Sequence, residues 1–344
     1  MNNFAAPFRL AVNGYGRIGR CFVRAVYEAG LADVLRVVAI NEPANLDSMA
    51  HLTRFDSTHG RFPGEVGVNH AQNTLVLEGR PVAVTHARLP GEVDWCALEI
   101  DLLVECSGSY VERSQLQGFI DAGCPRLLLS NPGAHAQDVD ATVVYGFNHE
   151  TFDPHVKLVS AASCTTNAVI PVLNVLHEAF GIEHALLTTL HSAMNDQPLI
   201  DGYHHRDLAR TRSAMQSIIP VTTGLARGVE RFLPKLTGRV DAKAIRVPTH
   251  NVSAIDMVLA LSKKTDTQNV LAVLNKLCGG SPMIGCTENV PHASIDFNHD
   301  SRSAIIDRSQ IRTCGAHMLN LLVWFDNEWG FANRMVELAQ YWLR

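Results

Sequence analysis

A cysteine between small hydroxyl residues offers a nucleophile. The stretch Ser163-Cys164-Thr165-Thr166-Asn167 follows a strand-like run over 156–160, and apolar residues then recur at helical spacing until Gly181. This pattern predicts a helix over 164–180 that begins at Cys164. Free backbone N–H groups and the helix dipole favour a thiolate at such a position. A lone cysteine is usually inert packing, so the neighbouring residues decide the interpretation.

A glycine-rich stretch carries the pattern that binds the phosphates of a dinucleotide. Gly14-Tyr15-Gly16-Arg17-Ile18-Gly19 leaves an apolar strand over 8–12 and opens a helix expected over 17–29. In this motif Gly14 allows the tight turn, Gly16 lets the backbone approach a pyrophosphate, and Gly19 permits close helix–strand packing.

An acidic residue at the end of the next strand strengthens this interpretation. The strand expected over 35–40 is followed by Asn41-Glu42. A carboxylate at that place accepts hydrogen bonds from the adenosine ribose and repels a 2′-phosphate. The two features together predict NAD rather than NADP as the cofactor.

The elements that must position these residues differ between the two halves of the chain. In the first half, apolar strands such as 102–105 and 126–130 alternate with helical patterns such as 111–122, which predicts a parallel α/β Rossmann-type sheet. In the second half, strand-like segments follow one another with few helices between them, which predicts an α+β domain with a mainly antiparallel sheet. These segments are 185–190, 241–247, 252–261 and 318–325, and an amphipathic helix is expected over 328–343.

Length and composition restrict the classes of function. The 344 residues exceed the usual size of a single core, and 47% apolar with 18% charged residues is typical of a globular protein. The net charge of −5 includes no basic stripe for nucleic acid. No run reaches the length of a membrane span, and Met1 to Pro7 lack the features of a signal peptide. We therefore expect a cytoplasmic protein with neither a nucleic-acid nor a membrane partner.

The eight cysteines contain no Cys-x-x-Cys pair, and none lies in a tight cluster with histidines along the sequence. Zinc sites typically show such spacings. We therefore expect reduced thiols and no metal.

Further blocks extend the pattern along the whole chain. They are Asp56-Ser57-Thr58-His59-Gly60, Arg246-Val247-Pro248-Thr249 and Asp326-Asn327-Glu328-Trp329-Gly330. With these blocks, the glycine loop and the Cys164 segment, the chain resembles the glyceraldehyde-3-phosphate dehydrogenase superfamily from end to end. The resemblance implies a NAD-binding domain of residues 1–163 with 328–344, a catalytic domain of residues 164–327, and a homotetramer.

Within the superfamily the chain is most similar to the D-erythrose-4-phosphate dehydrogenase branch. The similarity lies in His191-Ser192-Ala193-Met194-Asn195-Asp196-Gln197, in the segment 296–300 and in the segment 331–335. Met194 replaces a hydroxyl residue of the glycolytic pattern. Thr222-Thr223-Gly224, in contrast, is more similar to the glycolytic pattern.

The resemblance implies a role for each motif residue. Cys164 attacks the aldehyde, and His191, 27 residues later at the end of a strand, stabilises the thiolate and moves protons. The implied cofactor-binding residues are Gly14, Gly16, Arg17, Ile18, Gly19, Glu42, Ser130 and Asn327. The implied substrate- or phosphate-binding residues are Ser163, Thr165, Asp196, Arg212, Thr223, Gly224 and Arg246.

Two enzymatic functions and one binding function fit these residues. The first is NAD-dependent oxidation of D-erythrose 4-phosphate to 4-phosphoerythronate, with water as the second substrate, as a step toward pyridoxal phosphate. The second is phosphorylating glyceraldehyde-3-phosphate dehydrogenase, in which inorganic phosphate attacks the same thioacyl intermediate. Met194 favours the first and Thr223-Gly224 the second. A regulatory protein without turnover is expected to lack the thiol or the histidine, and both are present.

Overall fold

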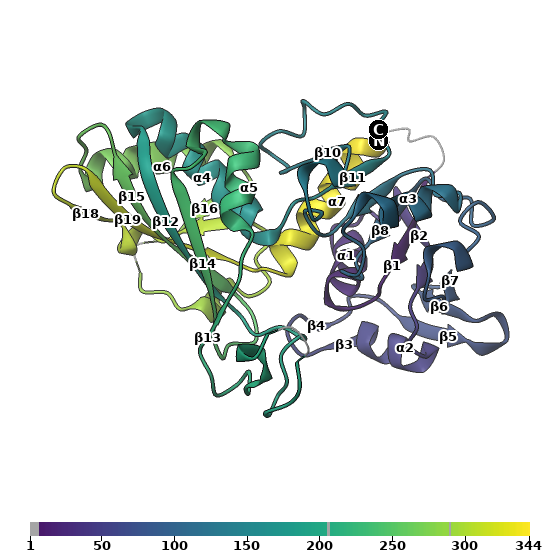
Figure 1. Ribbon diagram of the computed structural model, residues 1–344. Helices are drawn as coiled ribbons and strands as arrows, with labels where there is room; N and C mark the ends of the chain where they lie inside the picture. The colour runs from purple at the N-terminus through teal and green to yellow at the C-terminus, as the bar shows by residue number, and fades with distance from the viewer. Residues whose placement is uncertain (1–6, 205–206, 289) are drawn as a thin grey trace. The chain divides into compact units, whose positions relative to one another are not determined.

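The computed structural model describes residues 7–204, 207–288 and 290–344 and divides the chain into two compact units (Figure 1). The first unit comprises the residues up to Ser163 together with Ala332–Arg344, and the second comprises Cys164–Phe331. The last helix, α7 (Trp329–Leu343), therefore begins in the second unit, where Trp329 stacks on His299 with 3.9 Å between ring centroids. Most of the N-terminal segment used for the signal-peptide expectation, residues 1–6, lies outside the described residues.

The first unit is built on a sheet in which the described residues form nine strands, in the order β10-β11-β9-β8-β1-β2-β7-β6-β5. The pairs from β10 to β7 are parallel, and the β5–β6 and β6–β7 pairs are antiparallel. The central strands are β1 (Phe8–Asn13), β2 (Leu35–Asn41), β8 (Leu102–Glu105), β9 (Leu127–Leu129) and β11 (Leu158–Ser160). The outer strands are β5 (Val66–Asn69), β6 (Thr74–Leu77), β7 (Arg80–Thr85) and β10 (Ala141–Thr142), and the helices are α1 (Arg17–Glu28), α2 (Leu46–Arg54) and α3 (Arg113–Asp121).

The strand order creates a binding crevice. The chain moves from β1 to β2 on one side and later returns to the other side of β1 with β8. Ligands of such sheets bind at the carboxyl ends of the strands where the order reverses. Strands β8 and β9 are buried along their whole length, as strands of a covered parallel sheet are. The predicted parallel sheet is confirmed.

The second unit contains a mixed sheet. Its order is β13-β14-β12-β15-β19-β17-β16, with β18 paired to β19. The β12–β14 and β16–β17 pairs are parallel and the remaining pairs antiparallel, so the predicted mainly antiparallel sheet is confirmed. The strands are β12 (Ile182–His191), β13 (Ile219–Val221), β14 (Val240–Arg246), β15 (Ser253–Leu261), β16 (Ile284–Cys286), β17 (Ala304–Ile306), β18 (Arg312–Cys314) and β19 (Met318–Phe325).

Three helices lie over one face of this sheet: α4 (Cys164–Phe180), α5 (Leu225–Phe232) and α6 (Thr267–Gly280) (Figure 1). Of these three helices, the sequence pattern predicted only α4. Helices α5 and α6 are short or weakly amphipathic, and only two residues of each are buried. None of the helices in the described part of the chain combines the length and apolar character that crossing a membrane requires.

The expectation of reduced thiols is wrong for one pair. Cys278 near the end of α6 and Cys286 at the end of β16 form a disulfide with their Cα atoms 6.1 Å apart. The two residues are only eight positions apart, and the turn after α6 brings them together. No sequence motif announces this pairing, because it depends on the direction of the turn.

Candidate active site

The glycine loop has the geometry that the motif predicts. Gly14 follows β1 with a φ of +84°, and a Cβ there would lie 2.5 Å from the backbone nitrogen of Ser107. A Cβ at Gly19 would lie 2.2 Å from the carbonyl oxygen of Gly14, so only glycine lets α1 pack this closely. Gly16 differs, because a Cβ there would contact nothing within 4 Å. The protein's own packing requires Gly14 and Gly19, whereas Gly16 leaves open surface for a ligand.

A cavity of about 420 Å³ adjoins this loop at the carboxyl ends of β1, β2 and β8. Its lining comes only from the first unit. The lining residues are Asn13, Gly14, Gly16, Asn41, Glu42, Pro43, Ala87, Arg88, Cys106, Ser107, Ser109 and Tyr110. The predicted residues Gly14, Gly16 and Glu42 therefore share one cavity.

Glu42 also holds the loop in place. One carboxylate oxygen accepts a hydrogen bond from the backbone nitrogen of Tyr15 at 2.8 Å, and the other accepts one from Ala44 at 3.2 Å. The backbone N–H groups of Tyr15 and Ala44 thus fix the orientation of the Glu42 carboxylate at the cavity. The sequence motif did not predict this contact.

Arg17, at the start of α1, is held by Asp56 of the short strand β3 (Phe55–Asp56) through an ion pair. Burial alone would raise the pKa of Asp56. Hydrogen bonds from Arg17 and from the backbone of His59 and Thr58 outweigh it and lower this pKa to about 2. The block 56–60 therefore braces the glycine loop. Ile18 is half-buried on α1 beside Arg17.

A buried acid under the cavity was missed by the sequence analysis. Glu105, at the end of β8, accepts hydrogen bonds from the side chain of Asn13 and from the backbone of Ser107 at 2.7 Å. Its burial raises its pKa. The backbone nitrogen of Ser130 donates to the Glu105 carbonyl at 3.0 Å, which ties that predicted residue to the same strand end. A buried polar residue at the end of an otherwise apolar strand is the only sequence signal for Glu105.

In the second unit, Asn327 has a fixed orientation. Its Oδ1 accepts hydrogen bonds from the hydroxyl groups of Ser192 at 2.9 Å and Ser253 at 2.8 Å. Asn327 is only 8% exposed. Because two donors occupy Oδ1, the Nδ2 amino group is the end of the amide that can serve a ligand. Neither serine was predicted.

Cys164 begins α4 as predicted, and it is half-buried. Burial raises the pKa of its thiol to about 11, although the backbone N–H groups of Thr165 and Cys164 and the charge of Arg246 act in the opposite direction. Burial therefore opposes, in the free protein, the preference for thiolate expected at this helix N-terminus. The helix N-terminus does lower the pKa, but desolvation has the larger effect.

His191 ends β12, and its Nδ1 lies 2.8 Å from the carbonyl oxygen of Ser192. A carbonyl can only accept, so Nδ1 carries the proton and Nε2 presents a lone pair. Burial lowers the pKa of His191 below its ordinary value, and the charge of Arg246 adds to this effect. The ring is therefore neutral at pH 7 and able to take a proton.

Arg246 connects the predicted residues of the second unit. It ends β14 opposite His191 in the parallel β12–β14 register, and its charge acts on both Cys164 and His191. Its Nη1 donates to Asp196 Oδ1 and to Gln197 Oε1, both at 2.9 Å. Arg210, which the sequence analysis did not select, donates to the other oxygen of Asp196 at 2.7 Å. One carboxylate thus lies between two guanidinium groups.

This Asp196 carboxylate is ionised at neutral pH. Burial by itself would raise its pKa, but the hydrogen bond and charge of Arg246 and the charge of Arg210 lower it. Arg210 also pairs with Asp207 at 3.2 Å, so two guanidinium groups are balanced by two carboxylates. Arg246 is only 8% exposed, which strengthens the interactions of its charge.

The remaining residues predicted to bind phosphate lie in three separate segments of the second unit and its boundary. Arg212 is 65% exposed, and its only ion pair among the described residues is with Asp201, so the structure does not join it to the Arg246 cluster. Thr223 Oγ1 accepts a hydrogen bond from the backbone of Leu225, and Gly224 is the N-cap of α5. Ser163 and Thr165 flank Cys164 and are half-buried.

Models of two protein domains match the chain. The glyceraldehyde 3-phosphate dehydrogenase NAD binding domain matches residues 8–113, and the glyceraldehyde 3-phosphate dehydrogenase C-terminal domain matches residues 163–327. The chain belongs to the glyceraldehyde 3-phosphate dehydrogenase family. It is an NAD-dependent oxidoreductase that acts on a phosphorylated aldehyde.

The first unit of this family member fits NAD in its local geometry. The open surface at Gly16 and the start of α1 suit a pyrophosphate, because free backbone N–H groups and the helix dipole attract anions. The fixed carboxylate of Glu42 in the same cavity suits a ribose and opposes a 2′-phosphate. The predicted cofactor is confirmed.

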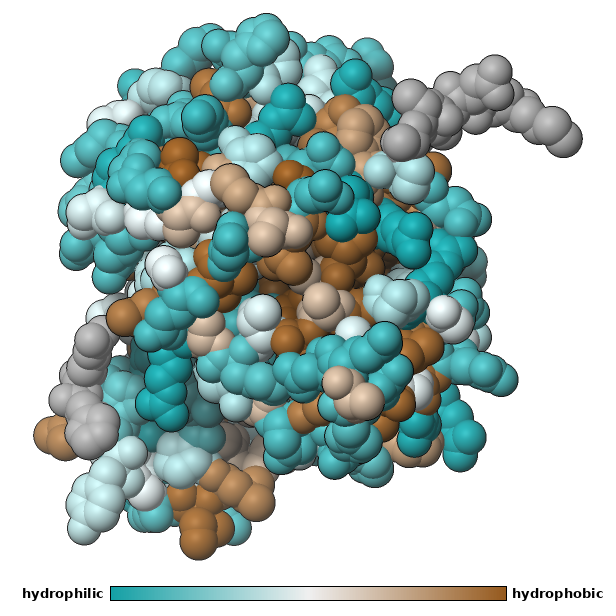
Figure 2. Space-filling view, turned by 90° about the vertical axis from the view of Figure 1, so that its right-hand side faces the viewer, coloured by the Kyte–Doolittle hydropathy of each residue, from teal (hydrophilic) through white to brown (hydrophobic). Residues whose placement is uncertain are grey.

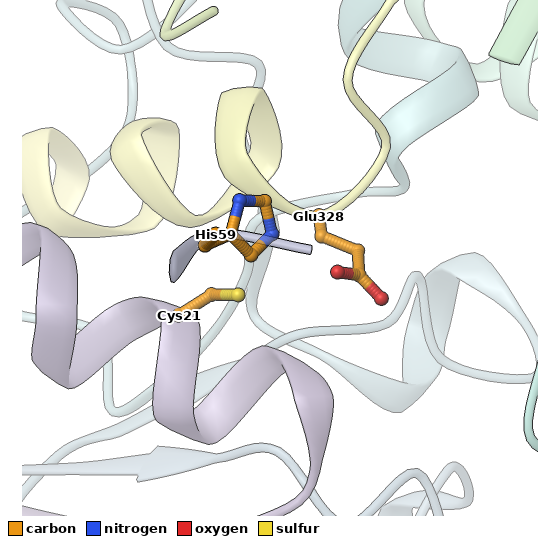
Figure 3. A group of neighbouring side chains, drawn as sticks. All are labelled: Cys21, His59 and Glu328. Carbon is orange, nitrogen blue, oxygen red and sulfur yellow. The ribbon is translucent and has the colours of Figure 1, made fainter. Parts of the chain in front are cut away.

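One cysteine–histidine contact lies within the first unit. Figure 3 shows Cys21 on α1 beside His59, and their ligand atoms lie within 4.8 Å of each other. Glu328, the third labelled side chain, belongs to the second unit. Two ligands from one unit are fewer than a structural zinc site uses. The absence of a resident metal stays a prediction.

Proposed function

We propose that this enzyme oxidises D-erythrose 4-phosphate to 4-phosphoerythronate, with water rather than inorganic phosphate releasing the product. The observation that carries the proposal is the ion pair between Arg246 and Asp196. A phosphorylating enzyme must hold two anions at once, the substrate's phosphate group and inorganic phosphate. Asp196 pairs with Arg246 and Arg210, and Asp207 pairs with Arg210 as well, so the two guanidinium charges are already balanced and the carboxylates repel a second anion.

The proposed chemistry begins at Cys164. In the free protein its thiol is protonated and His191 is neutral, so Nε2 of His191 takes the thiol proton as sulfur attacks the aldehyde carbon. His191 passes this proton to the carbonyl oxygen, which gives a hemithioacetal and leaves the imidazole neutral. The backbone N–H of Cys164 stabilises the negative oxygen that forms during attack.

Oxidation and release use the same two residues. His191 removes the hydroxyl proton of the hemithioacetal, and a thioacyl group remains on Cys164. NAD supplies the hydride acceptor for this oxidation. His191 releases that hydroxyl proton to solvent and then removes a proton from water as it attacks the thioacyl carbon; the thiol regains this second proton from His191 when the C–S bond breaks. The products are the acid, the reduced cofactor and one proton.

Several residues hold the cofactor and substrate in this proposal. The Nδ2 group of Asn327, oriented by Ser192 and Ser253, holds the nicotinamide carboxamide. The cofactor's phosphates and ribose lie against residues of the first unit, Gly14, Gly16, Arg17, Ile18, Gly19, Glu42 and Ser130. The substrate's phosphate group lies against Ser163, Thr165, Thr223, Gly224 and Arg246, with Asp196 limiting the charge, while Arg212 pairs with Asp201 outside this set.

Steady-state rates with both aldehydes, with and without inorganic phosphate, test the proposal. We expect a higher kcat/KM for erythrose 4-phosphate and almost no dependence on phosphate. Asp196→Asn removes the carboxylate charge while keeping an acceptor for Arg246, and we expect it to create a measurable acceleration by phosphate. Asp33→Asn is the matched control, because Asp33 pairs with Arg80 on the first unit and is exposed. Strict phosphate dependence of the natural enzyme would refute the water reaction.

The glycolytic alternative has one specific observation in its favour. Thr223 and Gly224 follow the glycolytic pattern, and the hydroxyl of Thr223 accepts a hydrogen bond from the backbone of Leu225, the first residue of α5, where an anion is favourable. Helix α5 has only eight residues, so its dipole contributes little. A preference for glyceraldehyde 3-phosphate together with phosphate dependence would establish this alternative.

We also propose a cytoplasmic homotetramer whose product is used toward pyridoxal phosphate. Figure 2 shows apolar residues gathered in patches at the surface of the molecule. In the second unit, exposed apolar side chains concentrate on the loop after β12 and on the uncovered face of the sheet. They are Leu186, Met194, Leu199, Ile200, Tyr203, Leu208, Ile218 and Met318. Light scattering of the purified protein measures the assembly, and a monomeric mass at micromolar concentration would contradict it.

A further inference from the structure

The disulfide between Cys278 and Cys286 lies at a weak place in the fold. Beyond Leu274, no residue of α6 is buried. The helix ends with Gly279 and Gly280, and glycine is the least favourable helix residue after proline. A Cβ at either glycine would contact nothing, so packing does not explain these residues. The covalent link is therefore the main restraint on the last turn of α6.

The surrounding structure has other connections that do not need the disulfide. The guanidinium group of Arg308 donates to Asn275 Oδ1 on α6 at 2.8 and 3.1 Å. The backbone nitrogen of Arg308 donates to Thr287 Oγ1, one residue after Cys286. Strand β16 is paired in register with β17. Reduction should therefore free the end of α6 without detaching the helix or the strand.

Both cysteines are half-buried, so small thiols and disulfides can reach them. Disulfides in reducing compartments are mostly transient or redox-sensing. We propose that Cys278 and Cys286 form a reversible redox site, separate from the catalytic cysteine, that fixes or releases the last turn of α6. This inference goes beyond the proposed reaction and rests only on the cytoplasmic location proposed above.

The oxidation proceeds by exchange with a small-molecule disulfide such as oxidised glutathione. One protein thiolate attacks a sulfur of glutathione disulfide, which forms a mixed disulfide and expels one glutathione thiolate. The second protein thiolate attacks the protein sulfur of the mixed disulfide and expels the second glutathione. Two protein thiols lose two electrons, glutathione disulfide gains them, and the two protons end on the released glutathione thiols.

The pairing can be measured on a single peptide. Trypsin leaves Cys278 and Cys286 together on the peptide 277–302, while Cys164 lies on another peptide, so its oxidation is scored separately. The native full-length protein is equilibrated with glutathione mixtures, quenched with acid, alkylated and analysed by mass spectrometry. We expect the peptide to change from two alkylated thiols to an internal disulfide across the series, and to return with dithiothreitol.

Hydrogen exchange tests the structural consequence. We expect exchange of the amides in 276–283 to be about tenfold faster in the reduced protein, with a melting temperature lower by a few degrees. Cys278→Ser and Cys286→Ser should show the fast exchange under all conditions. Cys314→Ser, at an exposed free cysteine, should behave as the natural protein.

Three outcomes would overturn the proposal. Two alkylated thiols at every glutathione ratio would show that the pair does not form. A disulfide that survives dithiothreitol in the native protein would show a permanent link. Equal exchange in the two redox states would show that the bond does not control the last turn of α6.

Discussion

The cofactor region of the first unit and the catalytic region of the second unit are built in different ways. In the first unit, backbone geometry makes the site: a positive φ at Gly14, the close contact of Gly19 and the open surface at Gly16, all within six residues. In the second unit, side-chain charge makes the site. Cys164, His191 and Arg246 come from three separate elements, and the positive charge of Arg246 lowers the pKa values of the other two.

This difference predicts which changes each region tolerates. Where backbone geometry forms the site, a substitution adds atoms that clash with the backbone or the ligand. Such a clash lowers the stability of the protein or weakens ligand binding. Where charges and proton positions form the site, a substitution lowers the rate of the reaction, while the fold and cofactor binding persist. Substitutions in the two units should therefore separate catalysis from cofactor binding.

The largest effect is expected at the nucleophile. Cys164→Ser should abolish aldehyde oxidation while NAD affinity changes by less than about twofold, because the hydroxyl is far less acidic than the thiol and the cofactor site lies on other residues. Fluorescence titration with NAD and a single-turnover assay measure the two quantities. Substantial remaining turnover would remove Cys164 from the mechanism.

The next largest effect is expected at the base. His191→Asn should lower kcat/KM by about 10²–10⁴-fold, because the proton acceptor is lost while the fold is kept. The pKa of His191 lies below 6.5 because of burial, so the rate of the natural enzyme should fall as the pH drops through that lower value and the ring becomes charged. A variant with the natural rate would show that another group takes the proton.

The same region gives a prediction about thiol chemistry. Because burial raises the pKa of Cys164 to about 11, its alkylation by iodoacetamide in the free enzyme should accelerate about tenfold per pH unit and show no plateau below pH 9. His191→Asn should slow the alkylation, because the variant lacks the base that accepts the thiol proton. A plateau near neutral pH that the variant loses would instead indicate a thiolate–imidazolium pair.

Two glycines of the first unit should respond differently to the same substitution by alanine. Gly16→Ala should leave the melting temperature nearly unchanged and weaken NAD binding by about 10–100-fold, because the new methyl group occupies the space that a phosphate oxygen approaches. Gly19→Ala should instead destabilise the protein by about 1–3 kcal/mol through the clash with Gly14. Calorimetry with and without NAD separates the two results, and equal stability losses would contradict the distinction.

The sequence predicted the cofactor region better than the catalytic region for the same physical reason. The glycine motif, the strands and Glu42 are local patterns, and each was found where it was expected. The raised pKa of Cys164 could not be predicted because burial is a property of the folded structure. Arg210 and Gln197 were missed because only the fold brings them to Asp196 and Arg246. The Cys278–Cys286 pair depends on a turn that no motif marks.

The smallest expected effect concerns substrate length, and it tests whether charge or shape selects the aldehyde. Met194 is 46% exposed, and its backbone makes two hydrogen bonds: its nitrogen donates to Gln197 Oε1 at 3.3 Å, and its carbonyl oxygen accepts from the Gln197 nitrogen at 3.0 Å. Met194→Thr restores the hydroxyl of the glycolytic pattern beside the Arg246 cluster. One added hydrogen bond is worth about 1 kcal/mol, so the preference for erythrose 4-phosphate over glyceraldehyde 3-phosphate should fall by up to about tenfold.

Comparing Met194→Thr with Asp196→Asn separates the effect of side-chain shape from the effect of charge. If the charge of Asp196 excludes phosphate and Met194 adjusts the shape for chain length, Met194→Thr should change the ratio of kcat/KM for the two aldehydes without creating dependence on phosphate. Asp196→Asn should do the reverse. Competition assays with both aldehydes, at several phosphate concentrations, measure both ratios in one experiment. A Met194→Thr enzyme that requires phosphate would show that shape and charge act together on the deacylating nucleophile, and the separation of roles proposed for these two residues would be wrong.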